Sequence, residues 1–155
     1  MAELEVGNTL PPFHLPRDGG GFLDSASLAG KPFVLYVYPK DNTEGCTLEA
    51  VDFSSLNKDF AKLGVAIVGL SPDNARSHDR FKAKHGLKLD LVSDENREVL
   101  ESLGLWVEKS LYGRKYMGVE RATVLVGADG RIARVWRKVR VRGHAAEVLE
   151  AAKAL

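Results

Sequence analysis

Two short apolar runs constrain the fold of this 155-residue chain most strongly. FVLYVY spans 33–38 and VAIVGL spans 65–70. Unbroken β-branched and aromatic runs of this length are typical of strands that are covered on both faces of a sheet. Gly64 is well placed to end a helix between them. That helix is indicated by apolar residues at helical spacing, namely Ala50, Phe53, Leu56, Phe60 and Leu63. The pattern predicts a right-handed βαβ unit.

The segments that follow extend this unit. SPD (71–73) favours the start of a second helix that stops before Gly86. We then expect a short strand at 89–92 and a short helix at 96–103. Residues 105–120 are polar and aromatic without a clear period, and are interpreted as a loop.

The C-terminal part adds a hairpin and a helix. RATVLVGADGRIARVW (121–136) predicts two strands around Ala-Asp-Gly. A last helix carries Val148, Leu149, Ala152 and Leu155 on one face. The element order predicts an α/β fold of thioredoxin type, with a central mixed β-sheet flanked by helices on both faces.

Composition and length limit the class of protein. With 45% hydrophobic and 28% charged residues, the chain reads as one soluble globular domain over 1–155. The N-terminus lacks the features of a secretory signal, and the longest apolar runs are far shorter than the ~20 residues that span a bilayer. With a single cysteine, an internal disulfide is excluded. We therefore expect a cytoplasmic protein that is not bound to a membrane.

One segment is strongly basic. RIARVWRKVRVR (131–142) contains six basic residues and no acidic residue. Because Val139 and Val141 alternate with cations, the segment is interpreted as a strand with one solvent-exposed face. The net charge of only +1 argues against a nucleic-acid partner. Docking of an acidic reductant protein on this segment is the better of the two hypotheses.

The only cysteine, Cys46, lies in PKDNTEGCTLEAV (39–51), at the carboxyl end of a predicted central strand. Open α/β sheets place their active crevice at this end. Cys46 also falls about one turn into a predicted helix, where unpaired N–H groups and the helix dipole favour a thiolate. Thr43 stands at N-cap spacing, so its hydroxyl could accept from the Cys46 amide or turn toward a ligand at the sulfur. Position alone leaves a packing cysteine and a nucleophile both open.

The wider pattern favours the nucleophile. Pro39, Thr43 and Cys46 form P-x-x-x-T-x-x-C, the active-site signature of peroxiredoxins. YVYPKDNTEGCTLEA resembles the active-site segment of the peroxiredoxin Q (bacterioferritin-comigratory-protein) subfamily. The later blocks SPDNARSHDRFKAKHGL, DLVSDENREV and GVERATVLVGADGRI are similar to that subfamily in order and spacing, so the resemblance covers nearly the whole chain.

The resemblance implies a role for each matched residue. Cys46 would be the peroxidatic nucleophile of a thiol peroxidase that reduces hydrogen peroxide and organic hydroperoxides. Thr43 would hydrogen-bond the peroxide, Pro39 would shield the thiolate and shape the pocket, and Gly45 would support the site. These roles suit the chemistry, since cleavage of an O–O bond needs a thiolate and donors for the departing oxygen.

Two further residues are carried over from the family. Arg121 matches an arginine that reaches across to the sulfur and the substrate, and Glu49 matches an acidic helix residue that holds such an arginine. Arginine is always protonated and offers several donors in a fixed fork, so it can serve sulfur and substrate together. Without the resemblance, both residues would be interpreted as solvated surface charges.

The chain departs from the subfamily pattern at two positions. Glu44 stands where members usually have proline, and Val51 stands where many have a second cysteine. Without an internal resolving thiol, we predict a one-cysteine cycle in which Cys46 is oxidised to sulfenic acid. The reductant would be an external thiol, either thioredoxin, a glutaredoxin or a low-molecular-weight thiol. Because relatives are often monomers, we expect a monomer.

No cofactor is implied, and no metal site is predicted. His78 and His85 are seven residues apart on one predicted helix, too far for a compact metal site, and His144 is interpreted as a solvated or capping residue. Two rival functions stay open: a monothiol disulfide oxidoreductase, and a non-catalytic redox sensor or holdase. The absence of C-x-x-C argues against the first of these rivals.

Overall fold

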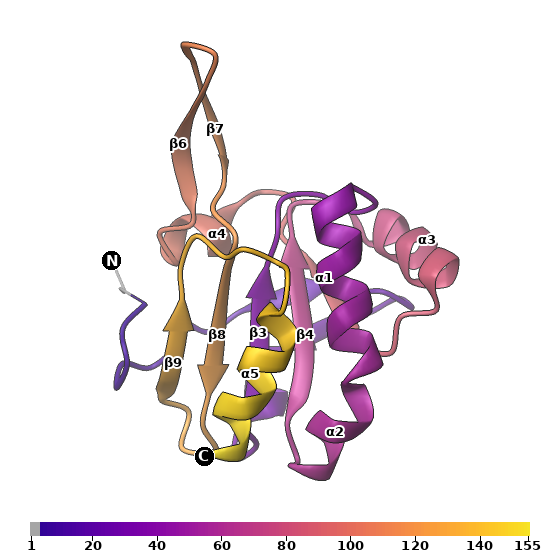
Figure 1. The fold of residues 1–155 in the computed structure, drawn as a ribbon, viewed down its shortest axis with the longest axis vertical. Coiled ribbons are helices and arrows are strands. Elements are labelled where there is room, and N and C mark those ends of the chain that lie inside the picture. The colour runs from indigo at the N-terminus through magenta and orange to yellow at the C-terminus, as the bar shows by residue number, and fades with distance from the viewer. Residues whose placement is uncertain (1–3) are drawn as a thin grey trace.

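The centre of the protein is a five-stranded sheet (Figure 1). The structure, a computed structural model, describes residues 4–155. The strand order is β5-β4-β3-β8-β9. Their bounds are β3 Phe33–Val37, β4 Ala66–Ser71, β5 Asp90–Ser93, β8 Ala122–Val126 and β9 Ile132–Trp136. β3, β4 and β5 are parallel, whereas β8 pairs antiparallel with both β3 and β9. The predicted βαβ unit, C-terminal hairpin and mixed sheet are confirmed.

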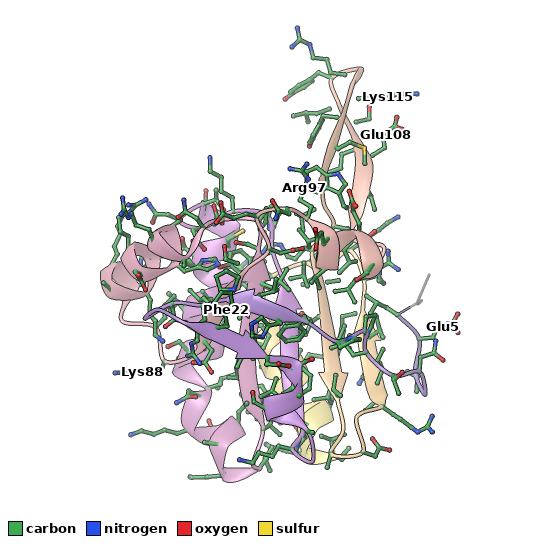
Figure 2. The ribbon with its side chains drawn as sticks, turned by 180° about the vertical axis from the view of Figure 1, so that it is seen from behind. Glu5, Phe22, Lys88, Arg97, Glu108 and Lys115 are labelled. Carbon is green, nitrogen blue, oxygen red and sulfur yellow. The ribbon has the colours of Figure 1, made fainter. Side chains whose placement is uncertain are left out.

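Helices cover both faces of the sheet, as predicted. Because side chains of β3 alternate, Val34 and Tyr36 face one hydrophobic cluster while Leu35 and Val37 face the other. The first cluster is shared with α1 (Glu44–Ser55), α2 (Asn57–Lys62), α3 (Ala75–His85) and α5 (His144–Lys153). The second face is covered by α4 (Glu98–Ser102) and by β1 (His14–Pro16) and β2 (Phe22–Asp24), which lead into the 3-10 helix η1 (Ser25–Leu28). Figure 2 shows β2 with Phe22 on this second face.

The segment interpreted as a loop is a β-hairpin, so that prediction is wrong. Strands β6 (Trp106–Leu111) and β7 (Arg114–Val119) pair over their whole length and form a separate two-stranded sheet. The two turn residues, Tyr112 and Gly113, both have positive φ, as tight hairpin turns of type I′ require. The hairpin projects from the body of the protein, and most of its residues are exposed. The alternation of apolar and polar residues that normally identifies a strand is therefore absent.

Contacts at its base orient this hairpin. The Arg97 guanidinium lies 4.8 Å from the centre of the Trp106 ring. Figure 2 shows Arg97 at the base of the hairpin and Glu108 near Lys115 farther along it. Those two side chains form an exposed ion pair with 3.6 Å between the charged atoms.

Helix boundaries differ from the predictions at four places, the first being α4, which spans Glu98–Ser102 and not 96–103. The helix expected up to Gly64 is divided into α1 and α2 at Leu56. The SPD segment does not start a helix, because α3 begins at Ala75 with the Asn74 side chain as its N-cap. The last helix ends at Lys153, so Leu155 lies beyond it and is exposed. Within residues 4–155, no helix is long and apolar enough to cross a bilayer.

The basic segment after β9 does not continue as a strand. β9 ends at Trp136, and Lys138 adopts a positive φ of 49°. The Arg137 side chain is bonded to Glu120, and the Val139 N–H donates to the Arg121 carbonyl at 3.0 Å. These bonds turn the chain along the start of β8, so the expected alternating strand is wrong.

Candidate active site

Cys46 lies in the first turn of α1, directly after the loop that follows β3. This is the helix position that the sequence predicts. The side chain is 1% exposed and belongs to the hydrophobic cluster between the sheet and α1. The Arg121 Nη2 atom donates to the Cys46 sulfur at 3.1 Å. The sulfur is therefore held between an apolar core and a permanent cation.

Sheet register explains how Arg121 reaches a cysteine 75 residues earlier in the chain. β8 runs antiparallel to β3, and its first residue, Ala122, pairs with Val37 at the end of β3. Arg121 precedes Ala122, so its side chain starts next to the point where the chain leaves β3 for α1. The structure thus brings together the two residues that the sequence resemblance had paired.

Glu49 completes this arrangement. It lies one helical turn after Cys46, and its Oε1 atom accepts from Arg121 Nη1 at 2.6 Å. Glu49 is 1% exposed, and burial raises its pKa to about 7 although the Arg121 charge and hydrogen bond act in the opposite direction. Its second oxygen, Oε2, has no hydrogen-bond partner. Gly45 leaves room for the guanidinium, since a Cβ there would lie 3.4 Å from Arg121 Nη2.

Thr43 and Pro39 occupy the loop that leads into α1. Thr43 is the N-cap residue by backbone geometry, with φ −89° and ψ 159°. Its hydroxyl does not cap the helix but donates to the Lys40 carbonyl at 2.9 Å. Of the two alternatives for this hydroxyl, the bond to the Cys46 amide is therefore not made. Pro39 is half-buried directly after Tyr38, the buried residue at the end of the first apolar run.

Sequence reasoning missed a buried polar network beneath this loop. The Asp41 carboxylate accepts from the Tyr38 hydroxyl, the Ser77 hydroxyl and the His78 ring. His78 Nε2 lies 2.9 Å from the Val92 carbonyl oxygen. Asp41 and His78 are 37 residues apart, and no local pattern links them. The one available signal was that Asp41 lies between the matched Pro39 and Thr43.

The interpretation of His144 also changes. His144 is buried rather than solvated, and its Nε2 lies 2.8 Å from the Thr123 hydroxyl. Burial lowers its pKa to about 4, so the ring is neutral near pH 7. In residues 4–155, no group of three or more His, Cys, Asp or Glu side chains is placed to hold a metal ion.

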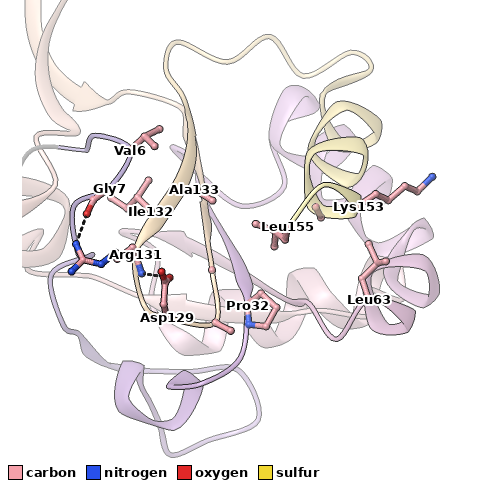
Figure 3. A pocket seen from close by; sticks show the side chains of 13 residues that line it. Val6, Gly7, Pro32, Leu63, Asp129, Arg131, Ile132, Ala133, Lys153 and Leu155 are labelled. Atoms are coloured by element: carbon pink, nitrogen blue, oxygen red, sulfur yellow. Dashed lines mark hydrogen bonds between the residues drawn. The ribbon is translucent and has the colours of Figure 1, made fainter.

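One cavity borders this site, and a second lies far from it. A cavity of about 510 Å³ contains Arg121 in its wall and is bordered by Lys109 and Lys138. Another of about 700 Å³ opens at the opposite end of β3, where Pro32, Leu63 and Leu155 contribute to an apolar lining (Figure 3). No residue that the sequence predicts for the active site lines the second cavity.

Comparisons with known proteins agree with this arrangement. The AhpC/TSA family matches residues 6–135. A putative peroxiredoxin Bcp from Coxiella burnetii is 44% identical over 146 residues, covering 94% of this chain and 97% of that protein. A solved cysteine-to-serine mutant of Xylella fastidiosa PrxQ has a TM-score of 0.93 at 35% identity, covering 99% of this chain and 98% of the other.

A third relative carries functional information. The bacterioferritin comigratory protein of Xanthomonas campestris has a TM-score of 0.87 at 42% identity, covering 92% of this chain and 90% of the other. Its structures are described as giving insight into alkyl peroxide reduction activity.

Proposed function

Because this chain belongs to the AhpC/TSA family and is a thiol peroxidase of the Bcp and PrxQ group of peroxiredoxins, we propose that Cys46 is its peroxidatic cysteine. The proposed substrates are hydrogen peroxide and small alkyl hydroperoxides, in line with the alkyl peroxide reduction described for the Xanthomonas campestris relative. The observation that carries the proposal is that one half-buried arginine, Arg121, contacts both the Cys46 sulfur and the Glu49 carboxylate.

The proposed first step follows from these contacts. The Cys46 thiolate attacks one peroxide oxygen, an S–O bond forms and the O–O bond breaks. The other oxygen leaves as hydroxide or alkoxide and takes up a proton to become water or an alcohol, while Cys46 becomes sulfenic acid. Arg121 stabilises the thiolate before the attack and the charge on the leaving oxygen during it. Glu49 holds the guanidinium so that its donors need not reorganise.

Thr43 and Pro39 are proposed to complete the pocket. The Thr43 hydroxyl rotates from the Lys40 carbonyl to donate to the peroxide, since a hydroxyl has one proton and can reorient it at little cost. Pro39 limits the approach of water to the sulfur. Gly45 keeps the space that the guanidinium occupies.

The second half of the cycle requires a partner. Cys46 is the only cysteine in the chain, so a thiol from another molecule attacks the sulfenic sulfur and releases water. A second external thiol then reduces the mixed disulfide and regenerates Cys46. Thioredoxin, a glutaredoxin or a small thiol could supply both equivalents. Val51, at the position of the second cysteine in many subfamily members, is 39% exposed whereas Cys46 is buried.

We further propose that the protein is a cytoplasmic monomer that binds neither nucleic acid nor membrane. The net charge of +1 supports the absence of a nucleic-acid partner. A sedimentation experiment at micromolar protein checks the oligomeric state, and a dimer would contradict this part of the proposal.

Stopped-flow oxidation tests the central claim. Wild-type protein and the Cys46→Ser variant are mixed with hydrogen peroxide or a small alkyl hydroperoxide, and sulfenic acid formation is followed with a trapping reagent. We expect wild-type oxidation to be orders of magnitude faster than that of free cysteine and to be absent in the variant. Oxidation no faster than that of free cysteine would instead favour a disulfide oxidoreductase or a redox sensor. Steady-state turnover with each candidate reductant then identifies the partner.

A further inference from the structure

The loop between β3 and α1 is anchored by a buried carboxylate. Asp41 is 7% exposed, and three donors from two segments surround its oxygens. The Tyr38 hydroxyl lies 2.5 Å from Oδ1, while the Ser77 hydroxyl and His78 Nδ1 lie 2.8 Å and 2.7 Å from Oδ2. Both oxygens of Asp41 face donors, and a carboxylate that only accepts has the hydrogen-bond geometry of the ionised form.

The surroundings of His78 determine its protonation state. The ring is completely buried, and both of its nitrogens face hydrogen-bond acceptors. Nε2 lies 2.9 Å from the Val92 carbonyl oxygen, which can only accept, so Nε2 carries a proton. Nδ1 lies 2.7 Å from the Asp41 carboxylate, which accepts from every other group around it, so Nδ1 carries a proton as well. A ring with both nitrogens protonated is an imidazolium cation.

Electrostatics agree with this geometry. Burial lowers the pKa of His78, but the hydrogen bond and charge of Asp41, the Val92 carbonyl and the charge of Asp73 outweigh burial and raise the pKa above its ordinary value of 6.5. Across the loop, burial and the neighbouring charges raise the pKa of Tyr38 well above its ordinary value, so its hydroxyl remains a donor. The groups that face the ring thus come from the loop, from β5 and from the segment before α3.

The backbone of the loop is tied to the same network. The Asp41 N–H donates to Asp73 Oδ2 at 2.7 Å, and the Ser71 hydroxyl donates to the same oxygen at 2.7 Å. The next residue, Asn42, has a positive φ of 61°, a conformation that needs support from its neighbours. Thr43 follows at once as the N-cap residue of α1. The position of Asp41 therefore sets where the chain turns just before the active-site helix.

We propose that His78 is a positioning residue for the peroxidase reaction, because its buried imidazolium holds Asp41 and thereby fixes the loop that carries Pro39 and Thr43 beside Cys46. This inference rests on the proposed function of Cys46. His78 does not touch the peroxide and acts only through the loop. Loop misplacement slows a reaction whose partners must be held within a fraction of an ångström.

The proposal has a defined pH dependence. Since the pKa of His78 is higher in the folded protein than its ordinary value of 6.5, its contribution is fully present below about that pH. The contribution is lost as the pH rises through the raised pKa, where the imidazolium releases its proton to solvent. Asp41 then keeps its bonds from the Tyr38 and Ser77 hydroxyls but has lost its cationic partner, so positioning weakens on the alkaline side.

The first experiment compares His78→Gln with His85→Gln. His85 lies on the same helix and contacts the same loop, with Nε2 3.2 Å from the Asn42 side-chain oxygen, but at the surface. We expect His78→Gln to slow Cys46 oxidation by hydrogen peroxide about tenfold to a hundredfold at pH 6, and His85→Gln to change it little. The ratio of wild-type to His78→Gln rates should shrink toward one as the pH rises. The proposal would be overturned by a ratio near one at pH 6, or by a ratio that does not change with pH.

A second measurement needs no variant to fold. Nitrogen NMR of the wild-type protein at pH 6 should show both His78 ring nitrogens protonated, and a neutral ring would refute the imidazolium. The double variant Asp41→Asn/His78→Gln, which leaves no lone buried charge, should regain part of the lost rate. No recovery in a folded double variant would count against coupling through Asp41. If wild-type oxidation itself is as slow as free cysteine, the proposed function fails, whereas the NMR result still decides the state of His78.

Discussion

Glu120 and Arg121 are neighbours in the chain, yet each belongs to a different arginine–glutamate pair in a different environment. Arg121 pairs with Glu49 at 2.6 Å, where the two side chains are 17% and 1% exposed. Glu120 pairs with Arg137 at 2.5 Å and 3.1 Å, and the Arg137 side chain is 45% exposed. The first pair lies against the Cys46 sulfur, and the second fastens the segment after β9.

The pKa values of the two carboxylates shift in opposite directions. Burial raises the pKa of Glu49 to about 7 despite Arg121, whereas the hydrogen bond and charge of Arg137 lower the pKa of Glu120. The two pKa shifts differ in sign because burial outweighs Arg121 at Glu49, whereas the hydrogen bond from Arg137 outweighs burial at Glu120. A buried pair of this kind is a poor source of stability, which fits a role in positioning the guanidinium.

Removing each arginine in turn should give the largest difference between the two pairs, measured as the rate of Cys46 oxidation. Arg121→Ala is expected to slow Cys46 oxidation by about a hundredfold to a thousandfold, the usual effect of losing one donor to developing charge. Arg137→Ala keeps the sulfur contact and should change the rate only slightly. Stopped-flow oxidation of both variants measures the difference. Equal rates for the two variants would show that Arg121 is a structural residue only.

The pH dependence of stability should separate the two carboxylates next. Between its ordinary pKa of 4.5 and about 7, Glu49 keeps a proton in the folded protein that the unfolded chain has released. Raising the pH through this range therefore lowers the free energy of unfolding, on the order of 1.4 kcal/mol for each unit of pKa difference. Glu120 has the opposite sign, because its contribution is present above pH 4.5 and is lost as the pH falls through its lowered pKa.

Thermal unfolding of Glu49→Gln and Glu120→Gln across this pH range checks both signs. We expect Glu49→Gln to gain in Tm relative to wild type as the pH rises toward 7. Glu120→Gln should lose Tm relative to wild type near pH 7 and match it at acid pH. Parallel curves for the two variants would contradict the assigned environments.

Salt should produce the smallest effect. The Glu120–Arg137 pair, in which the Arg137 side chain is largely in solvent, is expected to contribute less than about 1 kcal/mol, and most of this should vanish in about 1 M salt. The Glu49–Arg121 pair should be almost insensitive, since ions do not reach a buried carboxylate. Double-mutant cycles of urea unfolding at low and high salt measure both coupling energies. A strong salt effect on the Glu49–Arg121 coupling would mean that water reaches the site.

Local pattern predicted the elements that are buried on at least one face. Periodicity and position predicted the strands at 33–38 and 65–70, the hairpin that begins at Ala122 and the helix that contains Cys46, because burial imposes a pattern on the residues. The hairpin at 106–119 was missed for the converse reason. It projects into solvent, so neither face imposes an apolar repeat on its sequence.

The sequence by itself determined that this chain has one thiol, that the thiol lies in the first part of a helix after a central strand, and that the chain offers no second thiol to pair with it. Resemblance added Arg121 and Glu49 as partners. Only the tertiary structure decided that Glu49 is buried with a pKa near 7 and that His78 lies under the active-site loop against Asp41. The reason is physical, because the energy of a charge depends on the water it has lost and on partners brought close by sheet register and helix packing, which no stretch of sequence contains.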